Sequence, residues 1–151
     1  MYQKSVTHYI TKIVVDIMFY FGIIATAALP FLSRRIGIYF LGFENQFQVP
    51  FVAILFLSGL CGIYILFNLK QMFRSLLSGN PFIDENVRHF RKMAAACFVV
   101  SLLYLAKCIF MYTIGTLIIA AIFAVGCLFC LTLKDLFKQA VNFKEENDLT
   151  I

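Results

Sequence analysis

The stretch Val49–Leu69, VPFVAILFLSGLCGIYILFNL, decides the fold class, because it has no charged residue over a length that can cross a lipid bilayer. A hydrocarbon core of about 30 Å is crossed by a helix of roughly 17–25 predominantly apolar residues. Three other runs meet this requirement: Ile13–Leu32, Ala94–Met111 and Ile114–Leu133. The sequence therefore predicts an all-α membrane protein with four transmembrane helices in a compact bundle.

Composition and segment lengths indicate a single membrane domain over residues 1–151. Hydrophobic residues make up 62% of the chain, charged residues 14%, and the mean hydropathy is +0.87. The segments outside the runs, such as 33–48, are too short to enclose a soluble core. A cleavable signal peptide is the alternative interpretation of the first run, but its apolar region would be shorter than the one found here.

The orientation in the membrane is predicted from the 13 Lys and Arg residues. Ten of them lie in the amino terminus, the segment 70–93 and the tail 134–151, whereas two lie in the segment 33–48 and one, Lys107, lies within the third run. The side that holds more basic residues is normally the cytoplasm. We therefore expect both termini and the segment 70–93 to be cytoplasmic, with the net charge of +5 facing anionic lipids.

The second and third helices are predicted to extend into the cytoplasm as a hairpin over residues 70–93. Ser78-Gly79-Asn80-Pro81 is a strong stop signal, since Gly79 can adopt a left-handed conformation and Pro81 lacks an amide hydrogen. Asp84 is the expected N-cap of the next helix. Arg88, Arg91 and Lys92 follow as a basic stripe, which indicates either contact with lipid phosphates or binding of an acidic protein surface.

The tail 134–151 ends in an acidic cluster, and two states of it are left open. Glu145, Glu146 and Asp148 share the predicted compartment with the basic residues of the hairpin, so they can dock against Arg74, Arg88 and Arg91. The alternative is a solvated, frayed tail.

Two motifs, together with the four spans, resemble a bacterial membrane family. They are Gly79-Asn80-Pro81-Phe82 followed by Glu85-Asn86, and Glu145-Glu146-Asn147-Asp148-Leu149-Thr150-Ile151 at the end. The combination resembles the family named domain of unknown function 2975, over essentially the whole chain. This resemblance implies a bacterial inner-membrane protein without established enzymatic activity, often encoded beside a small helix-turn-helix transcription regulator, and hence a sequestering role.

Residues that could carry chemistry are few. The five cysteines at positions 61, 97, 108, 127 and 130 lie in or beside apolar runs and are interpreted as packing residues, the C-x-x-C of Cys127 and Cys130 included. The two histidines, His8 and His89, have no partner at metal-ligand spacing. Asp16 and Lys107 lie near the ends of their runs, which favours anchoring at the bilayer interface over transport or proton relay.

Small residues in the spans predict close helix packing, with the first helix as a fourth member of the bundle, and leave a homo-oligomer open. The outer segment Ser33–Gln48 is rich in apolar side chains. We expect it to lie on the bilayer surface as an interfacial helix or short hairpin, with binding of a lipid or peptide signal as the alternative.

These observations favour a non-enzymatic membrane protein that binds or sequesters a cytoplasmic partner, such as a small helix-turn-helix regulator. A small transporter or an accessory subunit of a transport complex is the alternative, although the spans offer almost no polar path. No cofactor, metal or direct nucleic-acid binding is expected. The candidate surface for a partner or lipid comprises Arg74, Asn80, Pro81, Phe82, Glu85, Asn86, Arg88, Arg91, Lys92, Glu145, Glu146 and Asp148.

Overall fold

The computed structural model describes the backbone of residues 6–40, 45–79, 81–110 and 112–149, and the side chains of residues 8–32, 50–79, 81–109 and 112–147. This part of the chain contains four helices and no strand: α1 (Val6–Phe40), α2 (Asn45–Leu77), α3 (Asp84–Phe110) and α4 (Ile114–Leu149). All four are long and apolar enough to cross a membrane. The predicted four-helix membrane architecture is confirmed.

Each helix is longer than the apolar run that predicts it. α1 continues through Pro30 to Phe40, and α2 begins at Asn45 and includes Pro50. Pro is tolerated within membrane-spanning helices, because neighbouring groups and small local adjustments satisfy the freed carbonyls. Most of the segment 33–48 therefore belongs to α1 and α2, and its expected position on the bilayer surface stays a prediction.

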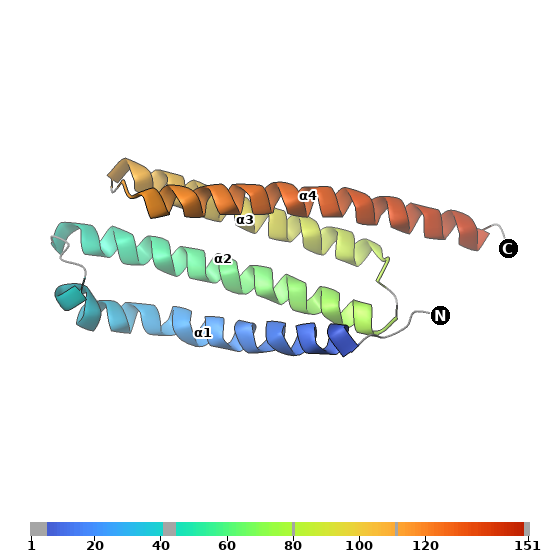
Figure 1. Ribbon diagram of the computed structural model, residues 1–151, viewed down its shortest axis with the longest axis horizontal. Coiled ribbons are helices and arrows are strands. Elements are labelled where there is room, and N and C mark those ends of the chain that lie inside the picture. Colours follow the sequence, from blue (N-terminus) through green and yellow to red (C-terminus); the bar gives the residue numbers. More distant parts are fainter. Residues whose placement is uncertain (1–5, 41–44, 80, 111, 150–151) are drawn as a thin grey trace.

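The four helices run along one long axis, and each packs against the next in the chain (Figure 1). Among the described residues, close backbone approaches join α1 to α2, α2 to α3 and α3 to α4, but do not join α1 to α3 or α4. Both termini and the α2–α3 turn lie at the same end of the molecule (Figure 1). In the described part of the chain, α1 thus joins the bundle by packing against α2 only.

The core lies between α2, α3 and α4 in two layers. One layer contains Met93, Ala94 and Cys130, with half-buried side chains of α2 packed against them. The second contains Val100, Tyr104 and Ala120. Ser101 Oγ donates a hydrogen bond of 2.9 Å to the carbonyl of Ala120, which ties α3 to α4 in the second layer. Apolar side chains on the outside, such as Phe21 and Ile122, are exposed, as expected of surfaces that face lipid.

Gly59 sets the closest approach of α1 and α2. A Cβ atom added at Gly59 would lie 2.7 Å from Oγ1 and 2.9 Å from Cγ2 of Thr26, a side chain on α1 that is buried. Gly62, one turn further along α2, has no atom within 4 Å of the same added position. Of these two glycines in the second span, Gly59 is therefore the one that allows α1 and α2 to approach closely.

We expect Gly59→Ala to destabilise the protein by about 1–3 kcal/mol, because the added methyl group forces Thr26 or the whole of α1 to move. Gly62→Ala is the matched control, and it should be neutral or stabilising by up to about 1 kcal/mol through helix propensity. Unfolding in mixed micelles with increasing fractions of dodecyl sulfate measures both changes. Equal effects of the two substitutions would contradict the assignment of the contact to Gly59.

Candidate functional site

The α2–α3 turn is built as the stop signal predicts. The amide of Ser78 donates to the carbonyl of Arg74 at 3.1 Å, and the amide of Gly79 donates to the carbonyl of Leu76 at 3.2 Å. Gly79 has a φ of 88°, the left-handed conformation that ends helices, which a side chain would strain. α3 then begins at Asp84, so Asp84 and Glu85 occupy its first turn, as expected for negative charge at a helix N-terminus.

Asn86 joins the start of α3 to the end of α2. Its side-chain nitrogen donates to the carbonyl of Pro81 at 2.6 Å and to Ser75 Oγ at 2.7 Å, and the residue is 2% exposed. A carbonyl oxygen can only accept, so the bond to Pro81 fixes which end of the amide is the nitrogen. Two members of the predicted surface, Pro81 and Asn86, thus have a structural role: they close the turn.

A second buried polar pair lies deeper between the same two helices. Asn68 on α2 is 1% exposed, and its nitrogen donates to the carbonyl of Tyr64 at 2.7 Å. Its oxygen therefore faces His89 Nδ1 on α3, at 2.8 Å, and accepts the proton of that nitrogen. The other ring nitrogen, His89 Nε2, lies 3.9 Å from the carboxylate of Glu85.

Asn68 is not among the residues predicted from the sequence, and His89 is considered there solely as a possible metal ligand. The position of Asn68 in an otherwise apolar run could have indicated a buried hydrogen bond, because an unpaired amide in such surroundings is costly. Its partner could not be read from one sequence, because the pairing depends on the register between α2 and α3.

Aromatic contacts connect the turn to α4. The Phe82 ring lies 5.7 Å from the Phe137 ring between centroids, and Phe90 on α3 lies 4.9 Å from Phe137. Phe137 thus contacts both the turn and the first half of α3. Phe82 remains 42% exposed, so one side of this aromatic cluster is free to contact a ligand or partner.

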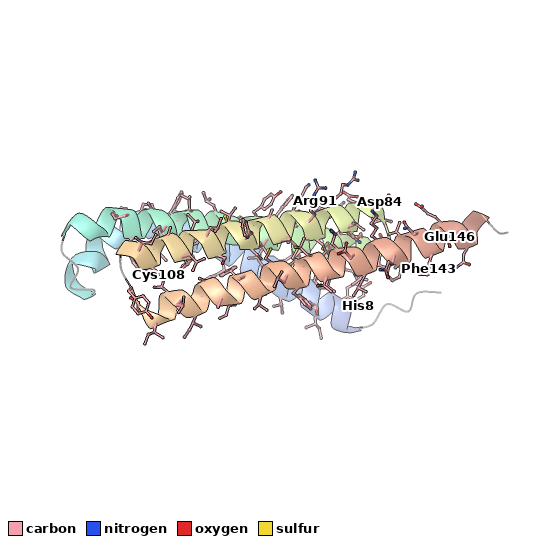
Figure 2. The ribbon with its side chains drawn as sticks, turned by 90° about the horizontal axis from the view of Figure 1, so that it is seen from above. His8, Asp84, Arg91, Cys108, Phe143 and Glu146 are labelled. Atoms are coloured by element: carbon pink, nitrogen blue, oxygen red, sulfur yellow. The ribbon has the colours of Figure 1, made fainter. Side chains whose placement is uncertain are left out.

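The charged members of the predicted surface are exposed: Arg74, Glu85, Arg88, Arg91, Lys92, Glu145 and Glu146. Arg91 lies on α3, whereas Glu146 lies near the projecting end of α4 (Figure 2). Within the described side chains, Glu145 forms no ion pair with Arg74, Arg88 or Arg91. The side chains of Asn80 and Asp148 lie outside the described residues.

The tail is a continuation of α4 as far as Leu149. Its helix extends past the ends of α2 and α3, with Phe143 and Glu146 near the tip (Figure 2). The backbone is therefore helical up to Leu149, and docking of the acidic side chains onto the basic hairpin stays a prediction.

The two charges in the apolar runs have partners on neighbouring helices. Asp16 Oδ1 on α1 lies 3.0 Å from Lys70 Nζ on α2. Lys107 Nζ lies 3.4 Å from Thr116 Oγ1 on α4 and 4.6 Å from the centroid of the Phe51 ring on α2. These side chains therefore connect helices, which the expectation of interface anchoring did not include.

The cysteines are free thiols among packed side chains. Cys97 and Cys130 are buried between α3 and α4, and Cys61, Cys108 and Cys127 are half-buried. In the described residues, no group of three His, Cys, Asp or Glu side chains is arranged to hold a metal ion.

A comparison with protein-family models matches residues 43–151 to the family described as protein of unknown function (DUF2975). The chain belongs to this family. The match covers α2, α3 and α4 and leaves α1 outside, so its extent is smaller than the whole-chain resemblance expected from the motifs. Neither the curated proteins nor the solved structures contain a match to this chain.

The family motif after the second span coincides with the residues that hold the turn. Removing the Asn86 amide should leave the Pro81 carbonyl without its donor, at a cost of about 1–3 kcal/mol. We therefore expect Asn86→Ala to lower the thermal unfolding temperature in detergent, whereas Asn142→Ala, which changes an exposed asparagine of α4, should not. A similarly small change of the unfolding temperature in both variants would show that the hydrogen bond to Pro81 is not needed for stability.

Proposed function

We propose that this protein is a non-enzymatic protein of the bacterial inner membrane that binds a small helix-turn-helix regulator at its cytoplasmic end and keeps it from DNA. The observation that carries the proposal is the projecting end of α4. It continues as a helix to Leu149 and exposes Phe143, Glu145 and Glu146. These residues form an exposed surface with two carboxylates and an aromatic ring.

The chemistry of that surface suits a DNA-binding partner. A helix-turn-helix regulator reads the major groove with a basic helix, so its DNA-contacting face attracts carboxylates. Phe143, at 66% exposed, adds an aromatic anchor of the kind that contributes strongly to interfaces. A regulator held this way would have its DNA-reading face covered.

The polar contacts within the spans favour this proposal over a transporter. Ser101 bonds to the Ala120 carbonyl and Lys107 to Thr116, so these polar groups are already used in joining helices. A transport path requires polar groups that face a water-filled route.

The cytoplasmic placement of this end rests on the positive-inside distribution, and accessibility labelling tests it. In a cysteine-free background, Ser78→Cys should be labelled from the cytoplasm and Thr113→Cys, in the turn before α4, from the outside. Labelling of Ser78→Cys by an impermeant reagent added outside intact cells would overturn the orientation.

The regulator interaction is tested with the protein in nanodiscs and the purified helix-turn-helix regulator encoded beside it. Glu145→Gln with Glu146→Gln should weaken binding by up to about 30-fold, since each exposed charge pair contributes roughly 0.2–1 kcal/mol. Asp84→Asn with Asp135→Asn is the matched control, because it removes two other exposed carboxylates.

Operator DNA provides the second measurement. It should compete with the membrane protein for the regulator, because both would occupy the same basic helix. Equal binding by both double variants, or a regulator that binds DNA and the membrane protein together, would refute the proposed role.

A further inference from the structure

An open cavity of about 390 Å³, lined by charged and polar residues, lies between α1 and α2 at the end of the molecule that carries the termini. Its lining is Lys12 and Asp16 from α1, with Lys70, Gln71 and Arg74 from α2. The spacings of four residues, from Lys12 to Asp16 and from Lys70 to Arg74, place each set on one face of its helix. Neither of the functional roles considered above uses this cavity.

The charges in the cavity are unequal. Three cations face one carboxylate, and that carboxylate is already paired with Lys70, whose Nζ lies 3.0 Å from Asp16 Oδ1. Lys70 is further held over two aromatic rings, 5.3 Å from the Phe19 centroid and 5.0 Å from the Tyr20 centroid. Lys12 and Arg74 form no ion pair with any side chain that the structure describes. The cavity therefore has an excess of two positive charges, one from each helix.

The sequence positions of the lining residues place the cavity at the level expected for bilayer headgroups. Lys70 directly follows the apolar run Val49–Leu69, and Asp16 is near the start of α1. One turn deeper, Phe19 packs against Phe67 with ring centroids 6.3 Å apart. Aromatic residues concentrate at the boundary between headgroups and hydrocarbon, and basic pockets between spans on the cytoplasmic side bind anionic headgroups.

We propose that this cavity binds the phosphate group of one anionic phospholipid. Arg74 supplies the planar donor pair that suits two phosphate oxygens, and Lys12 supplies a second positive charge from the opposite helix. The exposed rings of Tyr20 and Phe67 lie on the hydrocarbon side of the cavity, where the acyl chains of the same lipid would run. The cavity volume lies within the range of about 300–1,000 Å³ that is usual for small-molecule sites.

Such a lipid would act as a bridge between α1 and the rest of the protein. Among the described residues, α1 approaches α2 and no other helix, so a phosphate held by Lys12 and Arg74 reinforces the contact that keeps α1 in place. This inference is independent of the regulator proposal, because it uses different residues and a different ligand.

The test is titration of the full-length protein in neutral detergent at physiological salt with phosphatidylglycerol, followed by native mass spectrometry and by the lipid-dependent rise in unfolding temperature. Phosphatidylcholine and inorganic phosphate are titrated in parallel. We expect one phosphatidylglycerol to bind more tightly than either.

Lys12→Gln with Arg74→Gln should weaken phosphatidylglycerol binding about 25-fold, or about fivefold for each basic residue lost. Lys138→Gln with Lys144→Gln removes the same charge from exposed positions of α4 outside the cavity, and should retain the wild-type affinity within about twofold, because distant charges are screened. Lys12→Arg keeps the positive charge, so it should also retain the wild-type affinity for phosphatidylglycerol. The cavity variant leaves the Asp16–Lys70 pair intact, and its unfolding temperature without lipid shows whether it is folded.

Three results would overturn the proposal. One is an equal loss of affinity in the two double variants. Another is equal binding of phosphatidylcholine, which would indicate a nonspecific apolar contact. The third is inorganic phosphate that protects as well as the lipid, which would assign the site to a free anion.

Discussion

The hydrogen bond between Asn68 and His89 holds α2 and α3 in one register. Both side chains are buried, and a polar group in such surroundings is costly unless it is paired. A shift of either helix by one residue would turn these two groups away from each other. Because Asn86 and Ser75 repeat the arrangement one to two turns nearer the end, the whole α2–α3 hairpin is fixed by polar contacts, although most of its surface is apolar.

The other helices are placed by reference to that hairpin. α4 packs along α3, and its Phe137 contacts both Phe82 in the turn and Phe90. α1 packs against α2, the other helix of the hairpin, through the close contact of Thr26 with Gly59 and through the Asp16–Lys70 pair. The matched family region begins at residue 43, so it coincides with the part of the protein that contains this polar hairpin and α4.

Local features of the chain were predictable because local sequence determines them. Apolar run length identified the four helices, and Gly79 with Pro81 identified the turn, since backbone conformation at those two residues is restricted. Tertiary partners were not predictable in the same way. Asp16 and Lys107 were recognised as unusual, but their pairing with Lys70 and Thr116 depends on helix rotation and register, which periodicity does not specify.

The candidate site shows the same division. Asn86 and Phe82 were selected from a motif, yet their contacts with Pro81 and Phe137 could be known only from the folded chain. The tail was harder, because an acidic segment after a membrane span can dock against basic residues or remain solvated. The structure adds that its backbone continues α4 to Leu149, which neither alternative specified.

The pairing of α1 with α2 also has a consequence for biosynthesis. Translation proceeds from the amino terminus, so α1 reaches the bilayer before α2 does. During that interval Asp16 has no Lys70 beside it, and its charge must be tolerated by water and headgroups. Its position near one end of α1 makes this possible at a modest cost, whereas the same residue at the middle of the helix would oppose insertion.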